Sequence, residues 1–270
     1  ARERIQSRAP QGIQNPEGKA DPIVFQPDVA RMLLTQKTLI EGCRALSLVY
    51  AKYMDIEKLG TEEDKENAEK ILQFLTPICK AFMTDMGLET TSLGVQVFGG
   101  HGFIREWGME QLMRDVRISM LYEGTNGIQA LDLIGRKLTR DGGHMLEATY
   151  GAFNALVADI EDAQSKAKAQ TILDEWKVSS TECLGMDATT AASAACDYLA
   201  YSAYSLIAVL WYSMADTAQR SDNAVLAASK AKSRDFFIER LLPRREAHKA
   251  AYLAGPDSTM AISGSEFDYL

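Results

Sequence analysis

Apolar residues recur at intervals of three and four positions along most of the chain, which is the spacing of one face of an α-helix. A first long helix is predicted from Pro27 to about Asp55, and a second from Thr61 into the glycine-rich stretch near Gly99. Pro77 is expected to kink the second helix without ending it. Because no long run alternates with a strand period, this half is predicted to be an antiparallel bundle of long helices.

The second half continues the helical pattern. Helices are expected over residues 145–164, 169–178, 187–220 and 224–254, with alanine-rich segments that allow close packing. Asp141-Gly142-Gly143 is the best candidate for a domain boundary. The prediction is therefore an all-α protein with one helical-bundle domain over residues 1–140 and an additional helical domain over residues 141–270.

The chain begins without methionine, and residues 1–8 have the pattern of the end of a helix that starts upstream. Residues 9–26 contain three prolines and two glycines, which predicts a loop. The chain is therefore expected to be a fragment of a longer protein.

Composition narrows the functional classes. The 270 residues are 46% hydrophobic, which is enough for a substantial core, and the net charge of -8 disfavours nucleic-acid and anionic-membrane partners. The four cysteines lack the spacing of a zinc site and are expected to be reduced thiols of a cytoplasmic protein. No uninterrupted apolar run reaches the roughly 18 residues of a membrane-spanning helix, so neither a membrane partner nor a metal is expected.

The richest stretch for chemistry runs from residue 93 to residue 138. A helix is expected to break at Gly99-Gly100-His101-Gly102, where the glycines allow positive φ and close approach of another group. A short amphipathic helix should follow from Met109 to Met120. After it, Tyr122-Glu123-Gly124-Thr125-Asn126-Gly127 predicts a turn before a new helix at Ile128. Glu123 is thus expected in a loop, partly desolvated by Leu121 and Tyr122.

This stretch resembles the C-terminal signature of the acyl-CoA dehydrogenases. The matching pattern is Gln96-x-x-Gly99-Gly100-x-Gly102-Phe103, then Arg114-Asp115, then Tyr122-Glu123-Gly124-Thr125, in order and with the family's spacing. The resemblance implies the C-terminal helical bundle of that family. The additional helical domain is similar to that of the family's long variant, which includes the 3-methylmercaptopropionyl-CoA dehydrogenases.

The resemblance also implies FAD as cofactor and a set of site residues. Glu123 would be the catalytic base, and Gly124 would leave room for the substrate thioester. The cofactor-binding residues would be Arg4, Gln96, Gly99, Gly100, Thr125, Asn126 and Gly127. Of these, Arg4 and the residues from Gln96 to Gly100 would reach the phosphate end of a neighbouring subunit's flavin.

Two departures from the family pattern affect the implied flavin contacts. The loop of residues 9–26 replaces a Phe-Gly pair and a later glutamine, and Gly127 stands where many relatives have glutamine. The implied partners are an acyl-CoA substrate, an electron-transfer flavoprotein as electron acceptor, and a second copy of the full-length protein in a homodimer. The fragment alone is expected to be inactive.

Alternative interpretations remain open at this point. Glu123 could cap the next helix, since acidic residues favour helix N-termini. The whole chain could be a helical interaction protein or DNA-associated flavoprotein without dehydrogenase activity, although that relative should have a basic additional domain. An acyl-CoA oxidase would share the same residues, because oxygen access depends on the entire pocket.

Overall fold

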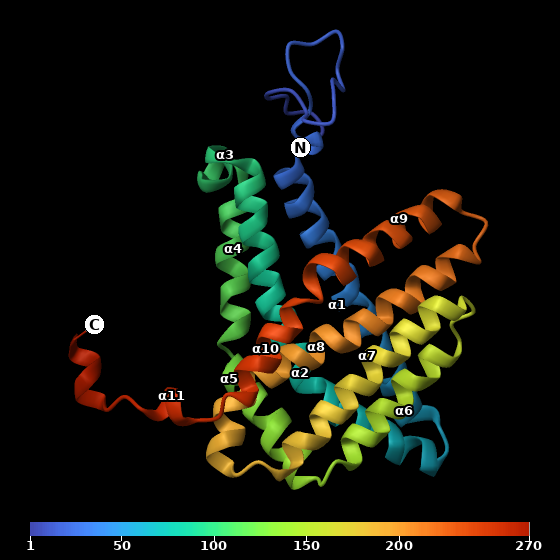
Figure 1. Cartoon of the computed structure of the whole chain (residues 1–270), viewed down its shortest axis with the longest axis vertical. Helices are drawn as coiled ribbons and strands as arrows, with labels where there is room; N and C mark the ends of the chain where they lie inside the picture. Colours follow the sequence, from blue (N-terminus) through green and yellow to red (C-terminus); the bar gives the residue numbers. More distant parts are fainter. Residues whose placement is uncertain (270) are drawn as a thin grey trace. The chain divides into compact units, whose positions relative to one another are not determined.

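The computed structural model of the chain describes residues 1–269 (Figure 1). Within them the α-helices are α1 (Pro27–Leu59), α2 (Glu62–Phe98), α3 (Gly100–Phe103), α4 (Met109–Arg117), α5 (Asn126–Leu131), α6 (His144–Ala158), α7 (Ala163–Glu182), α8 (Ala188–Gln219), α9 (Ala224–Phe236), α10 (Arg244–Leu253) and α11 (Asp257–Met260). The shorter or wider turns are η1 (Ile23–Phe25), η2 (Arg105–Trp107), η3 (Ile118–Met120), η4 (Asp132–Arg140), η5 (Cys183–Gly185), η6 (Phe237–Leu241) and η7 (Gly264–Tyr269). The predicted all-α class is confirmed for the described residues, whose strand-like pairing is an isolated bridge between Ile5 and Pro22.

The chain divides into two compact units. Unit 1 consists of Ala1–Glu41 and Thr84–Tyr122, and unit 2 consists of Gly42–Met83 and the chain from Glu123 onward. Helices α1 and α2 contain 33 and 37 residues. At a rise of about 1.5 Å per residue they are roughly 50 and 55 Å long, more than the diameter of a small domain, so each contributes to both units. The domain boundary expected at residues 140 and 141 stays a prediction.

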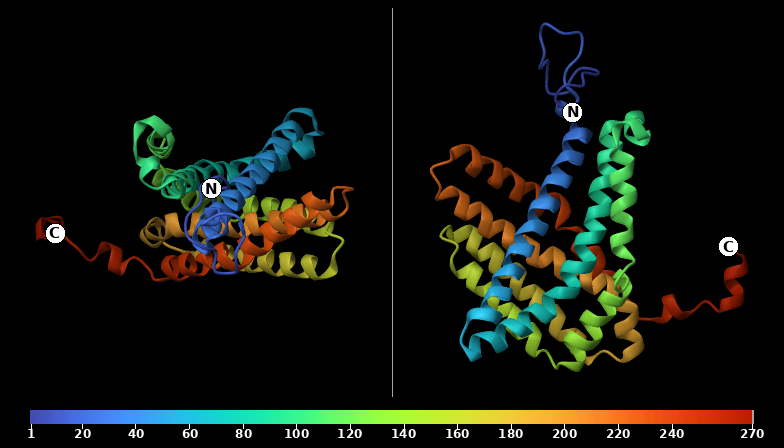
Figure 2. Two further views of the ribbon diagram at one scale, coloured as in Figure 1. Left: turned by 90° about the horizontal axis from the view of Figure 1, so that it is seen from above. Right: turned by 180° about the vertical axis from the view of Figure 1, so that it is seen from behind.

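Unit 2 is built around α8. Helices α7, α9 and α10 pack against α8, and α6 packs against α7 (Figure 2). The α2 segment of this unit contributes Phe74, whose ring meets Trp176 of α7 edge-on at a centroid distance of 5.9 Å. Both side chains are fully buried. Beyond α10 the chain extends away from the bundle through α11 and η7 (Figure 2).

Helix α8 bears on the expectation that the chain has no membrane-spanning segment. It is long and apolar enough to cross a membrane by length and composition alone, with a mean hydropathy of 1.2 over its most apolar 18-residue window. However, 78% of that window is buried inside the protein. This degree of burial is typical of a core helix, and the serines within α8 interrupt the apolar run, so its sequence contains no continuous apolar stretch of 18 residues.

Unit 1 contains the start of α1, the last turns of α2, and α4. Helix α4 approaches α2 over two glycines. A Cβ on Gly94 would lie 2.7 Å from Cε of Met109, and one on Gly87 would lie 2.9 Å from Cγ2 of Val116. The amphipathic helix predicted from Met109 to Met120 is confirmed. Its α-helical part, α4, ends at Arg117, and the 3₁₀ turn η3 follows.

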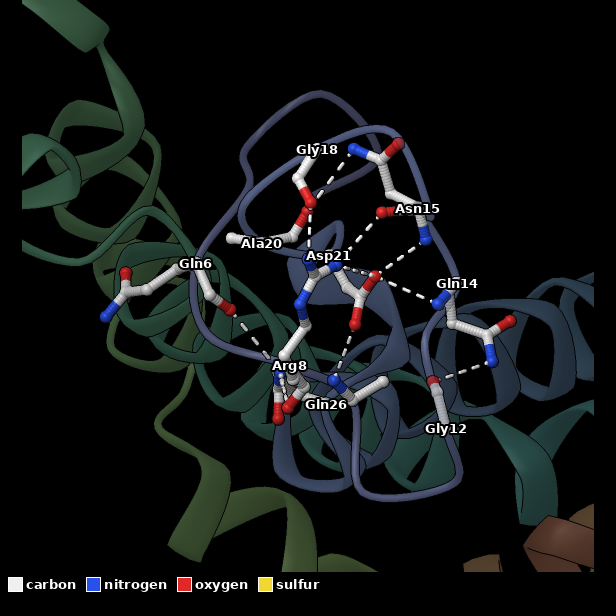
Figure 3. A network of polar contacts seen from close by, with 10 residues as sticks. Gln6, Arg8, Gly12, Gln14, Asn15, Gly18, Ala20, Asp21 and Gln26 are labelled. Atoms are coloured by element: carbon white, nitrogen blue, oxygen red, sulfur yellow. Dashed lines mark hydrogen bonds and ion pairs between the residues drawn. The ribbon is translucent and has the colours of Figure 1, made fainter.

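Residues 1–8 are not the end of a helix, so that prediction is wrong. The segment is extended, and its backbone pairs with residues 21–23 through bonds such as Asp21 N to Ser7 O at 2.8 Å and Ile23 N to Arg4 O at 2.8 Å. The loop that returns the chain is organised by Asp21, whose carboxylate is fully buried (Figure 3). It accepts the backbone N–H groups of Ala9 at 2.8 Å, Gln14 at 2.9 Å and Asn15 at 2.7 Å, and it pairs with Arg8. The prediction of a loop over residues 9–26 is confirmed except for the short turn η1.

Two predicted helices in the second half are in fact interrupted. The helix expected over residues 145–164 ends at Ala158, and α7 starts at Ala163 with Asp162 as its N-cap, accepting from Ser165 N at 2.7 Å. The helix expected over residues 224–254 breaks at Pro243, which lacks the N–H that a continuing helix requires. By contrast, α2 continues through Pro77 as predicted.

The cysteines are all free thiols. Cys183 is buried, Cys43 and Cys79 are half-buried, and Cys196 is exposed. Burial raises the pKa of Cys43, Cys79 and Cys183 to about 12 in each case. Thiols with such a pKa are poor nucleophiles at neutral pH, so these three cysteines are packing residues.

Candidate functional site

The structure places four of the predicted site residues around one cavity. Arg4, Gln96, Gly99 and Gly100 all line a cavity of about 1070 Å³ within unit 1. We call it the Arg4 cavity. Arg4 reaches it from the extended N-terminal segment, and the others reach it from the end of α2. The family resemblance predicted that these four residues bind the same ligand. In the structure, the backbone pairing of residues 4–7 with residues 21–23 places Arg4 at the cavity.

The rim of the Arg4 cavity is formed where α2 stops. Gly99 adopts φ 62° and ψ −144°, a conformation that side chains rarely permit, and it directs the chain into the single turn α3. Gly102 is required for a different reason, because a Cβ there would lie 2.4 Å from the backbone oxygen of Val95. Nothing lies within 4 Å of a Cβ built on Gly100. The backbone at Gly100 is therefore open to another molecule.

Aromatic side chains stiffen this rim. His101 meets the ring of Trp107 edge-on at a centroid distance of 5.1 Å, and Phe98 meets the same ring at 6.4 Å. His101 is exposed and lies in the single turn α3, where its ring contacts that of Trp107.

The charges around the Arg4 cavity suit an anion at one end. Arg4 is a permanent cation, and Gln96 offers an amide donor beside open backbone. Glu3 and Asp28 also line the cavity, but Asp28 is paired with Arg31 at 2.8 Å. A phosphate would be favoured near Arg4 and Gly100 and disfavoured near Glu3.

The other predicted site residues lie together in unit 2, on the loop between η3 and α5. Glu123 has φ 54°, and Gly124 has φ 90°. Thr125 is the N-cap of α5 and accepts from Ile128 N at 3.4 Å. The capping role considered for Glu123 is therefore filled by Thr125. Helix α5 begins at Asn126, two residues before the expected start.

The side chain of Glu123 is exposed, which contradicts the expected partial desolvation. The flanking side chains cannot shield it because Leu121 and Tyr122 are themselves 47% and 51% exposed. Within residues 1–269 the carboxylate of Glu123 has no hydrogen bond or ion pair. It is thus an accessible carboxylate for which the described residues provide no structural partner.

The loop is held against α2 by polar contacts. Nζ of Lys80 donates to the backbone carbonyl oxygen of Glu123, and Nδ2 of Asn126 donates to the carbonyl oxygen of Ala81 at 3.1 Å. Asn126 and Thr125 therefore have structural partners in addition to any ligand. Gly127 lies in the first turn of α5, where a Cβ would be 3.9 Å from Oγ1 of Thr125.

Lys80 was missed in the sequence analysis. A signal for it exists, since it is the one charged residue between Gln73 and Thr84 in a stretch otherwise dominated by apolar side chains. Its partner lies 43 positions away, and a pattern within the helix cannot identify such a partner.

Comparisons with known proteins give a consistent result. Residues 3–139 match the family model described as "Acyl-CoA dehydrogenase, C-terminal domain", and residues 144–263 match the one described as "Acetyl-CoA dehydrogenase C-terminal like". The first match covers half of the chain and includes all the predicted site residues.

Several curated proteins are similar to the chain. A 3-methylmercaptopropionyl-CoA dehydrogenase of Ruegeria pomeroyi is 45% identical over 169 residues, which are 63% of this chain and 28% of that protein. A butyryl-CoA dehydrogenase of Syntrophomonas wolfei is 38% identical over 54% of this chain and 24% of its own length. The broad-specificity linear acyl-CoA dehydrogenase FadE5 of Mycobacterium tuberculosis is 36% identical over 50% of this chain and 22% of its own length. The chain thus spans about a quarter of the length of these relatives.

Proposed function

Because the chain belongs to the acyl-CoA dehydrogenase family, we propose that it is the C-terminal catalytic part of an FAD-dependent enzyme that converts an acyl-CoA to the 2-enoyl-CoA. In this reaction the α-carbon of the thioester loses a proton and the β-carbon loses a hydride. FAD, when bound, supplies a two-electron acceptor for the hydride. The residues of this chain contribute the base and part of the binding surface.

Glu123 is proposed as the base. A carboxylate is a weak base in water, and it becomes stronger when a bound substrate expels water from around it. The exposed carboxylate of Glu123 is accessible to a substrate that could do so. The α-proton would move to this carboxylate as the C–H bond breaks.

The peptide around Glu123 is proposed to assist. The backbone N–H of Glu123 would donate to the thioester carbonyl, which gains negative charge as the α-proton leaves. Gly124 has φ 90°, and a larger residue there would be strained and would approach Nε2 of Gln129 within 3.1 Å. A glycine at this position thus leaves space beside the base for the thioester.

The cofactor contacts follow from the two groups of residues described above. Arg4, Gln96, Gly99 and Gly100 would hold the phosphate end of a neighbouring subunit's FAD through the guanidinium, the amide and the open backbone of the Arg4 cavity. Thr125, Asn126 and Gly127 would bind polar groups of FAD at the start of α5.

The observation that carries the proposal is the exposure of the Glu123 carboxylate and its lack of a structural partner within the described residues. It is an exposed carboxylate on a loop tethered to α2, and neither a helix cap nor an ion pair within the described residues accounts for it. Glu123 also differs from the other exposed glutamates in its backbone, since within residues 1–269 it and Ser7 are the non-glycine residues with positive φ.

The test is the Glu123→Gln substitution in a protein with the length of the relatives. Glutamine preserves the size of the side chain and cannot accept the proton. We expect FAD binding to persist and substrate-dependent flavin reduction to slow by at least about 100-fold, the low end for a general base. The Glu182→Gln variant, which changes an exposed glutamate at the end of α7, is the matched control and should retain full activity. Near-normal reduction by Glu123→Gln would refute the assignment.

The electron acceptor is proposed to be an electron-transfer flavoprotein, and the full-length protein is proposed to be a homodimer. Steady-state turnover should therefore depend on an added electron acceptor. Stoichiometric formation of hydrogen peroxide from oxygen would instead identify an oxidase.

A further inference from the structure

We propose that Lys80 is a positioning residue for Glu123 and that it fixes the backbone of the base through the carbonyl of that residue. This inference rests on the proposed function of Glu123. Lys80 lies in α2, and Nζ donates to the main-chain oxygen of Glu123 while the carboxylate is left accessible.

The backbone at Glu123 needs such a restraint. Within residues 1–269, Glu123 and Ser7 are the non-glycine residues with positive φ. Positive φ is sterically unfavourable for a residue that has a Cβ, which disfavours this conformation by roughly five- to thirtyfold in population. A glutamate retains the conformation when its surroundings stabilise it.

Lys80 acts on the backbone of the residue with the unfavourable φ. Its ammonium group donates to the carbonyl oxygen of Glu123, and a hydrogen bond from a charged donor is stronger than one between neutral groups. Rotation of Glu123 back to negative φ would turn this oxygen and break the bond. The contact therefore favours the observed conformation over the ordinary ones.

The main chain of α2 at Lys80 is itself held in place by buried neighbours. It lies between Ile78 and Phe82, which are 0% and 2% exposed and anchor this part of α2 in the core of unit 2. A second tether binds the same loop to the next residue of the helix, from Nδ2 of Asn126 to the oxygen of Ala81. Between these tethers, Gly124 and Thr125 form the turn into α5.

Positioning matters because side-chain and backbone directions are coupled. The φ of Glu123 sets both the direction in which its carboxylate leaves the chain and the orientation of its own N–H. Both groups have roles in the proposed proton removal, and small misplacements of reacting groups reduce rates substantially.

The first experiment uses the 270-residue chain and needs no cofactor. The protease Glu-C cleaves after glutamate, so cutting between Glu123 and Gly124 requires attack at the carbonyl that Lys80 holds. We expect Lys80→Met to speed this cut at least about threefold, because cleavage follows the population of the open loop. Lys80→Arg should leave it near the parent rate, and so should Lys70→Met, which removes a lysine paired with Glu66 on the same helix.

The second experiment measures flavin reduction in the longer, FAD-loaded protein. We expect Lys80→Met to lower the maximal rate constant by roughly tenfold, with a smaller change in KM, because the base is misplaced while the rest of the substrate surface is retained. Lys80→Arg should restore most of the rate, and Lys70→Met should have no effect.

The outcomes separate this inference from the proposed function. Unchanged cleavage and unchanged reduction in Lys80→Met, with Glu123→Gln inactive, would overturn the role of Lys80 and leave Glu123 as the base. Normal reduction by Glu123→Gln would overturn the proposed function and with it any role of Lys80 in the reaction. In that case the cleavage assay alone would still show whether Lys80 holds the loop. A loss of rate in Lys80→Met that Lys80→Arg does not restore would also contradict the positioning role.

Discussion

At the scale of single residues, the carboxylates of this chain differ in the hydrogen-bond donors that they contact. Asp21 accepts three backbone N–H groups, and Asp187 caps α8 by accepting from Thr189 N at 2.8 Å and Thr190 N at 3.0 Å. Such bonds favour the ionised form, and the pKa of each aspartate is lowered, chiefly by the Ala9 N–H at Asp21 and the Thr190 hydroxyl at Asp187. Among residues 1–269 the carboxylate of Glu123 has no donor of this kind, and this difference distinguishes Glu123 from these two aspartates.

The bonds to Asp21 predict how the N-terminal loop responds to pH. Because the pKa of Asp21 is lower in the folded chain, its bonds stabilise the loop above about pH 4, the ordinary value for aspartate, and are lost as pH falls through the folded-state pKa. Asp21→Asn should imitate that loss at pH 7. We expect hydrogen-exchange protection at the Ala9, Gln14 and Asn15 amides to fall roughly three- to tenfold. Asp222→Asn, in an exposed turn, should leave these amides unchanged, and equal protection in both variants would contradict the role of Asp21.

At the scale of elements, close helix contacts depend on particular glycines. Gly42 of α1 lies against α8 within unit 2, where a Cβ would be 2.6 Å from Cγ2 of Ile207 and 3.2 Å from Nε1 of Trp211. Cγ2 of an isoleucine is attached to Cβ and moves little, because β-branched side chains have few rotamers in a helix. The crossing of α1 and α8 therefore requires glycine.

Replacing Gly42 by alanine sets two effects against each other. Alanine improves helix propensity by about 1 kcal/mol, whereas overpacking costs about 1–3 kcal/mol. We expect a net loss of about 1 kcal/mol in the free energy of unfolding, measured with urea. Gly151→Ala is the matched control, since Gly151 is exposed on α6 with nothing within 4 Å of a built Cβ. It should gain about 0.5–1 kcal/mol. Equal effects of the two substitutions would show that packing at Gly42 is loose.

At the scale of the whole molecule, the chain holds its proposed contacts to FAD in two places. The Arg4 cavity belongs to unit 1, and the loop of Glu123 belongs to unit 2. The chain also spans about a quarter of the length of its relatives. Tight binding of a large cofactor requires most of its surface to be enclosed, and a single exposed cavity with open backbone does not provide that.

The purified 270-residue chain is therefore expected to be colourless and inactive on acyl-CoA while remaining folded. Folding should persist because unit 2 has an extensive apolar core around α8. The measurements are the visible absorbance of the purified protein, acyl-CoA-dependent dye reduction, and far-ultraviolet circular dichroism. Stoichiometric bound flavin or measurable turnover would contradict this expectation.

Features that depend on neighbouring residues could be predicted from the amino-acid sequence. The spacing of apolar positions gave the helical class and the approximate extent of α1, α2 and α8, because a helix repeats every 3.6 residues. Asp187 and Pro27 marked helix starts through local hydrogen bonding and a fixed φ. The spacing of the glycines and of Glu123 indicated the family.

Contacts between residues far apart in the chain became known from the tertiary structure. Asp216 accepts from the N–H groups of Glu161 and Asp162, 55 and 54 positions away, and so stabilises the turn that ends α6. Arg4 and Gly100 share a cavity, and Lys80 binds the carbonyl of Glu123, although no local pattern links the members of either pair. Such contacts form when packed helices bring distant residues together, and a periodicity within one helix carries no information about the partner it will meet.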